Sequence, residues 1–106
     1  MSPKDYNQPT YDLTELLDLI NNPSRFHITE RAFDDAVELG FASDYDIVCQ
    51  VSKITKNDFC YTMESEKKPG QMQDVYKMDW LDTVLYIKLR KSPYGEGVII
   101  SFHTTI

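Results

Sequence analysis

The stretch that decides the fold is MQDVYKMDWLDTVLYIKLRK, residues 72–91, in which polar and apolar side chains largely alternate on both sides of Leu81 and Asp82. Side chains alternate across a β-strand, so this period of two predicts strands over residues 72–80 and 83–91, with Leu81 and Asp82 as a tight link. Strands joined by so short a link must pair antiparallel. The stretch therefore predicts a β-hairpin.

The same pattern continues on either side of this hairpin. DFCYTME at residues 58–64 is followed by a turn that contains Pro69 and Gly70, and VIISFH at residues 98–103 follows the loop SPYGEG at residues 92–97. Both segments have the composition of strands bounded by turn residues. The second half of the chain is therefore predicted to be an antiparallel sheet of four successive strands.

The first half shows a helical period instead. Apolar residues recur three and four positions apart over residues 10–22, 29–40 and 43–53, and Thr or Ser stands at the start of the second and third segments as an N-cap. Gly40 suits the left-handed position that ends a helix. Between the first two segments, RFHI at residues 25–28 is a short β-like run. The expected fold class is α+β, with three N-terminal helices packed on one face of a C-terminal antiparallel β-sheet.

Length and composition favour a single domain. The chain has 106 residues, of which 42% are hydrophobic, enough for one core. Residues 1–9 are polar with two prolines and predict a flexible N-terminal arm ahead of one domain over residues 10–106. No apolar run could span a bilayer and no leader-like segment opens the chain, so we expect a cytoplasmic protein.

The cysteines and histidines do not suggest a metal site. Cys49 and Cys60 fall on segments that look buried and are interpreted as reduced core residues. Neither they nor His27 and His103 stand at metal-ligand spacing. We expect no metal and no cofactor.

Charge is distributed unevenly along the chain. The net charge is −6, yet residues 1–50 hold ten acidic and three basic residues, whereas residues 51–106 hold seven acidic and eight basic residues. Acidic helices argue against direct DNA binding. The second half remains able to bind an anion.

The alternation assigns side chains to the two faces of the sheet. In residues 83–91 the apolar set goes to the core, and in the last strand Val98, Ile100 and Phe102 are assigned there, which leaves Ile99 outside. Val75 falls on the outward side of residues 72–80. The polar members of the expected outward surface are an amide, cations, a phenol, a hydroxyl and an imidazole: Gln73, Lys77, Tyr86, Lys88, Arg90, Ser101 and His103.

Such a surface suits a phosphodiester. Metal-free RNA cleavage needs a base for the 2′-hydroxyl, an acid for the leaving 5′-oxygen and donors for the charge on phosphorus. His103 can exchange protons near neutral pH, the cations can hold phosphate, and Tyr86 can stack on a base or donate a proton. The competing interpretation is a solvated sheet face without a function, since Tyr, Lys and Arg are common there.

Four short motifs in order resemble those of the MqsR (motility quorum-sensing regulator) family of type II toxins, whose patterns are DFYKSM, WQDVY, VYLK and SFK. Here they are DFCYTM at residues 58–63, MQDVY at 72–76, LYIK at 85–88 and ISFH at 100–103. TYDL, RFHITERAFDDAVELG and DIVCQVSKIT also look like their family counterparts. The resemblance covers residues 11–103.

The resemblance implies a RelE-like fold and the activity of an mRNA interferase. Such a toxin is a metal-independent, sequence-selective endoribonuclease that cleaves mRNA by attack of the 2′-hydroxyl. It also implies neutralisation by a cognate antitoxin, which in the family is an MqsA-like, zinc-containing protein with a helix-turn-helix. No membrane association follows from it.

The resemblance further implies a site. Gln73 and Tyr86 are retained, whereas Tyr61 and His103 stand where the family has lysines. The histidine can keep a cationic or acid–base role, but the phenol of Tyr61 can only stack or donate a hydrogen bond. The predicted catalytic residues are therefore Gln73, Tyr86, His103 and Tyr61.

The predicted RNA-binding residues are the cations of the sheet and of the adjoining turn: Lys77, Lys88, Arg90, Lys67 and Lys68. Lys67 and Lys68 can supply the charge that Tyr61 lacks, or can be ordinary solubilising residues of a loop.

A second hypothesis is a non-catalytic RelE-like binding module or inhibitor that acts on a protein or RNA partner. The changes at Tyr61 and His103 and the net charge of −6 favour it.

Overall fold

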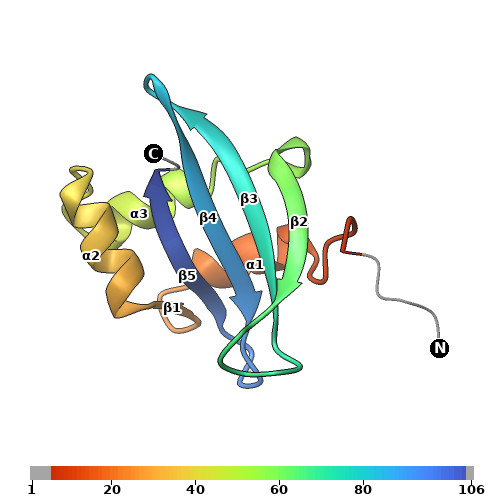
Figure 1. The fold of residues 1–106 in the computed structure, drawn as a ribbon. Helices are drawn as coiled ribbons and strands as arrows, with labels where there is room; N and C mark the ends of the chain where they lie inside the picture. Colours follow the sequence, from red (N-terminus) through yellow and green to blue (C-terminus); the bar gives the residue numbers. More distant parts are fainter. Residues whose placement is uncertain (1–5, 105–106) are drawn as a thin grey trace.

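The computed structural model describes residues 6–104, which form three α-helices and five strands (Figure 1). The helices are α1 (Leu13–Ile20), α2 (Glu30–Glu38) and α3 (Asp44–Val51), followed by a short 3₁₀ turn over Lys56–Asp58. The strands are β1 (Phe26–Ile28), β2 (Phe59–Glu64), β3 (Met72–Trp80), β4 (Thr83–Lys91) and β5 (Gly97–Thr104).

Side-chain caps begin all three helices, as expected from the exposed N–H groups of a first turn. Asp12 caps α1, the Thr29 hydroxyl accepts from Ala32 N at 3.2 Å, and the Ser43 hydroxyl accepts from Asp46 N at 3.3 Å. Gly40 follows α2 with a φ of 100°. The predicted helices and both predicted Thr and Ser caps are confirmed.

The antiparallel pairing predicted for the four successive strands is present, but the prediction of a purely antiparallel sheet made of these strands alone was wrong. The strand order is β1-β5-β4-β3-β2, and β1, which comes from the N-terminal half, pairs parallel with β5. The sheet is thus mixed and has five strands, so the expected RelE-like arrangement with a purely antiparallel C-terminal sheet is corrected to α+β with the helices ahead of most of a mixed sheet. A three-residue strand has almost no pattern of its own, and its partner lies about 70 residues away.

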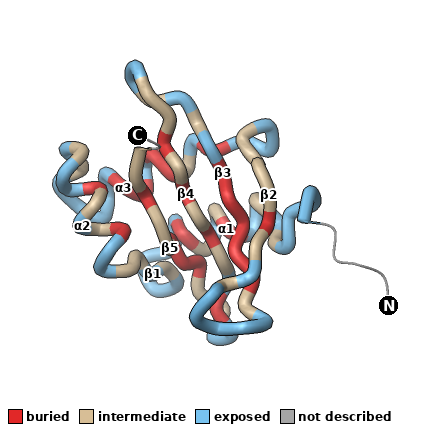
Figure 2. The backbone as a smooth tube through the Cα atoms, viewed as in Figure 1, coloured by how far each residue is buried: buried red, intermediate tan, exposed pale blue. Residues whose placement is uncertain are grey.

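The core lies between the sheet and the helices. Figure 1 shows α1 and α3 behind the sheet and α2 beside β5, and Figure 2 shows that both the strands and the helices contain buried residues. The largest fully buried hydrophobic side chains come from both layers: Leu16, Ile20, Ile47, Val51, Tyr76, Leu85, Ile87, Leu89, Ile99 and Phe102. The other face of β2 to β5 has no helix over it.

The cysteine prediction was half right. Both thiols are free, but Cys49 is exposed and Cys60 is half-buried, so neither is a core residue. Helix α3 buries Ile47, Val48, Gln50 and Val51, and Cys49 points to its solvent side.

A β-bulge in β5 reverses part of the predicted face assignment. Lys88 lies opposite Ser101, whereas Leu89 lies opposite Ile99, so Ile100 is the extra residue. Ile99 is fully buried in the core, and Ile100 is half-buried at the edge of an outer cleft. The assignment of Ile100 to the core and Ile99 to the outside was wrong, because one extra residue shifts the alternation by one position.

The same shift affects Val98. It lies opposite Arg90 on the outward side of the sheet and lines the same cleft, although it is nearly buried. Its predicted burial is therefore confirmed, but its assignment to the helix-covered face was wrong.

The segment before α1 is held against the sheet by a buried carboxylate. Asp74 is fully buried, and its two oxygens accept hydrogen bonds from Thr10 N and Tyr11 N, both at 2.9 Å. Of the predicted flexible arm, residues 1–5 lie outside the described residues, while the carbonyl of Tyr6 accepts from Thr62 N at 2.9 Å. The start of the described chain thus runs along β2 and β3.

Gly97 of β5 lies directly against helix α1. A methyl group added there would lie 2.8 Å from Ile20 Cγ1 and 3.1 Å from Ile20 N. We expect Gly97→Ala to lower the free energy of unfolding by about 1–3 kcal/mol, since overpacking forces the backbones apart. Urea denaturation measures this change. An unaltered midpoint would show that α1 can move away at no cost.

Candidate functional site

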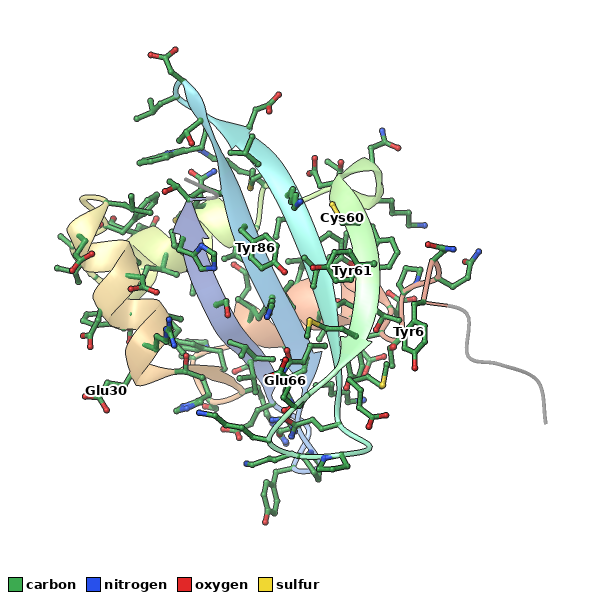
Figure 3. All side chains as sticks on the ribbon, viewed as in Figure 1. Tyr6, Glu30, Cys60, Tyr61, Glu66 and Tyr86 are labelled. Carbon is green, nitrogen blue, oxygen red and sulfur yellow. The ribbon has the colours of Figure 1, made fainter. Side chains whose placement is uncertain are left out.

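The uncovered face of the sheet carries a row of aromatic and cationic side chains (Figure 3). Tyr61 comes from β2, Lys77 from β3, Tyr86 and Lys88 from β4, and His103 from β5. Strand register brings them together, because Tyr86 lies opposite both Lys77 and His103. These five residues are called the Tyr86 cluster below.

Tyr86 is the centre of the cluster. Its hydroxyl oxygen lies 2.7 Å from that of Tyr61, and its ring stacks on His103 with the centroids 5.0 Å apart and the planes at 22°. The ammonium nitrogens of Lys77 and Lys88 lie 5.7 and 5.6 Å from the Tyr86 ring centroid. Both distances are within the range of a cation–π contact.

Tyr86 is held in its neutral form. Burial, and then the hydrogen bond with Tyr61, raise the pKa of Tyr86 well above its usual value of 10. The phenol can therefore donate a proton or a hydrogen bond at neutral pH but cannot act as a base. Two phenols share one hydrogen bond, so one of their two protons remains available to a ligand.

A hydrogen bond orients His103. Its Nδ1 lies 2.8 Å from the Thr104 carbonyl oxygen, which in the neutral imidazole makes Nδ1 the donor. The other nitrogen, Nε2, is then the proton acceptor. His103 thus presents a base next to the neutral phenol of Tyr86.

A second feature of the same face is a cleft of about 730 Å³ between the β2–β3 loop, the β4–β5 loop and β1. Gln73, Arg90, Lys67 and Lys68 line it, whereas no member of the Tyr86 cluster does. The predicted site residues are thus divided. Tyr86 contacts both Tyr61 and His103, with Lys77 and Lys88 beside its ring. The amide of Gln73 lies instead in the cleft with Lys67, Lys68 and Arg90.

The cleft also contains residues that sequence reasoning missed. The side-chain oxygen of Gln71, with the amide oriented to suit its neighbour, accepts from Arg90 Nη2 at 2.8 Å and from Nη1 at 3.2 Å. His27, Tyr94 and Glu96 line the cleft from loops and from the edge strand. Gln71, Tyr94 and Glu96 lie outside the strands, where no periodic pattern assigns a face, and His27 lies on a three-residue strand that is too short to show one.

Two kinds of feature are absent from residues 6–104, the part of the chain that the structure describes. No three His, Cys, Asp or Glu side chains among them converge on a position that could hold a metal ion. None of the helices in this part of the chain is long and apolar enough to cross a membrane.

The fold and the site define a small α+β protein whose open sheet face combines neutral phenols, an imidazole and lysines. The model of one protein family, described as "Motility quorum-sensing regulator, toxin of MqsA", matches residues 8–104, nearly the whole chain. The chain belongs to this family, and it is therefore a toxin of a toxin–antitoxin system with a cognate antitoxin as its partner. A search among curated proteins found no match.

Proposed function

We propose that this toxin is a metal-independent, sequence-selective endoribonuclease that cleaves mRNA in the cytoplasm through attack of the 2′-hydroxyl. The observation that carries the proposal is the contact of the neutral Tyr86 phenol with the His103 ring and two lysine ammonium groups on one open face. These groups match the needs of phosphodiester transesterification, namely a base, a proton donor and positive charge for the phosphorane.

The reaction assigns one role to each group. His103 Nε2 takes the proton of the 2′-hydroxyl, whose oxygen attacks phosphorus and forms a 2′,3′-cyclic phosphate. The bond between phosphorus and the 5′-oxygen breaks. The 5′-oxygen then receives the hydroxyl proton of the Tyr61–Tyr86 pair that is not used in the hydrogen bond between the two phenols. Lys77 and Lys88 offset the charge that grows on the non-bridging oxygens.

The decisive experiment is incubation of the purified protein with a long defined mRNA in EDTA, which removes metal-dependent contaminants. Primer extension maps the cuts, and the fragment ends are tested for a 2′,3′-cyclic phosphate. Discrete cuts at a recurring short sequence, absent with a Tyr86→Phe/His103→Ala double variant, are the expected result. A folded protein that leaves the RNA intact would refute the proposal.

The hydroxyl of Tyr86 is expected to contribute separately from its ring. Tyr86→Phe keeps the stacking surface for His103 but removes the proton donor, so we expect the cleavage rate to fall at least about tenfold. Tyr45→Phe is the matched control, because Tyr45 is exposed on α3, far from this face in sequence and structure. Equal rates for the two variants would remove Tyr86 from the reaction.

The second candidate is a non-catalytic module that uses the same face to bind a protein or RNA partner. The Tyr61–Tyr86 pair favours this candidate. The Tyr61 hydroxyl carries no positive charge, so it cannot offset the charge of a phosphate during cleavage. Binding of RNA without any cut in the EDTA experiment would support this candidate.

We further propose that the cognate antitoxin is an MqsA-like protein with a helix-turn-helix. The family description, which names MqsA as the antitoxin, supports this. Expression of the toxin alone should arrest growth, and co-expression of such an antitoxin from a neighbouring gene should relieve the arrest. Growth arrest that persists with the antitoxin would contradict this pairing.

A further inference from the structure

We propose that the cleft beside the Tyr86 cluster is the subsite that reads one base of the substrate RNA, with Gln73 as the reading residue. The backbone phosphate next to this base is held by Lys67, Lys68 and Arg90. This inference rests on the proposed ribonuclease function, and it assigns Gln73 to sequence selection rather than to the chemical step.

The side chain of Gln73 is the main reason. Gln73 is only 8% exposed and lines the cleft, yet its side-chain amide makes no hydrogen bond within residues 6–104. Within the described residues, every side-chain nitrogen or oxygen atom that is fully buried has a hydrogen-bond partner. The Gln73 amide has none, so it is not fully buried and must be accessible from the cleft. An amide that faces the cleft with no protein partner has its donors and its acceptor available to a ligand there.

An amide is suited to read a base. It presents two donor hydrogens beside an acceptor oxygen, and this pattern pairs bidentately with the edge of a nucleobase. Bases of single-stranded RNA are commonly splayed into protein pockets and read in this way. The cleft volume of about 730 Å³ lies within the range of ligand pockets and has room for a nucleotide.

The charge of the cleft points to nucleic acid. Three cations line it, Lys67, Lys68 and Arg90, against one carboxylate, Glu96, although the whole chain carries −6. The Arg90 guanidinium contacts the Gln71 oxygen and also hydrogen-bonds Tyr11. A guanidinium has five N–H donors, so it can hold these partners and a phosphate together. Tyr94, which is 83% exposed on the same rim, offers a ring for stacking.

The cleft is also in line with the proposed cleavage site. Tyr86, Lys88 and Arg90 alternate along the outward face of β4, so Arg90 lies about 13 Å from Tyr86 at roughly 3.3 Å per residue. Lys88 stands between them as a further cation. An RNA strand with its scissile phosphate at the Tyr86 cluster would therefore place a neighbouring nucleotide in the cleft.

The test compares cleavage of an RNA library randomised around one cut site by the wild type, Gln73→Met and Gln73→Glu. Methionine keeps the length of the side chain without the amide, and glutamate replaces its donor with an acceptor. We expect both to alter base preference at one position about tenfold or more. Tyr86→Phe, in contrast, should slow all sequences alike. A uniform loss of rate with an unchanged base profile in the Gln73 variants would overturn the inference.

A binding measurement separates this inference from the ribonuclease proposal. The full chain is titrated with an RNA oligonucleotide that carries a 2′-O-methyl group at the cut position, and the side-chain NH₂ signals of Gln73 are followed by NMR. We expect these signals to shift, and the affinity to fall several-fold in Lys67→Gln/Lys68→Gln but not in Lys53→Gln, which changes an exposed lysine outside the cleft.

The two experiments distinguish failure of the ribonuclease proposal from failure of the subsite inference. Shifted Gln73 signals without cleavage of unmodified RNA would keep the subsite and refute the ribonuclease. Cleavage with no shift of the Gln73 signals would keep the ribonuclease and refute the subsite.

Discussion

Replacing His103 with alanine should slow RNA cleavage about a hundredfold, because the variant loses the group assigned as general base. The Thr104 carbonyl contacts the imidazole at Nδ1, which leaves Nε2 as the nitrogen for the proposed proton transfer. The same change removes the ring that stacks on Tyr86. Initial rates of cut formation in EDTA, measured on one defined RNA, give the size of the effect.

Two readouts distinguish a lost base from a disturbed surface. Added imidazole should restore part of the rate of His103→Ala, because it can replace the missing base. Circular dichroism checks that the variant is folded. A variant that cuts at the wild-type rate would exclude His103 from the chemistry.

The largest effect on stability is expected at Asp74. Its carboxylate is fully buried and accepts from two backbone N–H groups, those of Thr10 and Tyr11. Asp74→Asn replaces one acceptor oxygen with an NH₂ group that faces a donor. We expect the free energy of unfolding to fall by about 2–4 kcal/mol, since hydrogen bonds to charged groups contribute about 1.5–3 kcal/mol each.

Urea denaturation with a matched control tests this expectation. Asp79→Asn makes the same chemical change on the same strand, but Asp79 is exposed. The free energy of unfolding of this variant should therefore stay within about 0.5 kcal/mol of the wild-type value, as is usual for surface substitutions. Equal midpoints for the two variants would mean that the N-terminal segment contributes nothing to stability. Loss of the hydrogen bond between Thr62 and Tyr6, seen as faster amide exchange at Thr62, would show that the whole segment had detached.

Much of the candidate site was accessible from alternation alone. Strands β3 and β4 were predicted to the residue, at 72–80 and 83–91. This placed Lys77, Tyr86, Lys88 and Arg90 on one face. The face that a side chain takes on a regular strand depends only on its position in the strand, which is why a local pattern was sufficient.

What the sequence could not supply was register and loop position. The phenol of Tyr61 meets that of Tyr86 because β2 and β4 both flank β3, and Gln73 is separated from them because it lies further along β3. Gln71 and Tyr94 meet Gln73 in the cleft only through the path of two loops. These contacts join residues that are far apart in the sequence, and the periodicity of hydrophobic residues within one element does not predict them.

The sequence by itself therefore determined the three helices, the caps of α2 and α3 and the four long strands in their chain order, because propensity, capping and alternation act over a few residues. Only the tertiary structure decided that β1 joins β5 in parallel and that a bulge turns Ile99 inward. The tertiary structure also decided that the outward face divides into the Tyr86 cluster and the cleft. The physical reason is that strand pairing and loop packing are chosen by contacts between residues distant in the chain, which bury the core as a whole.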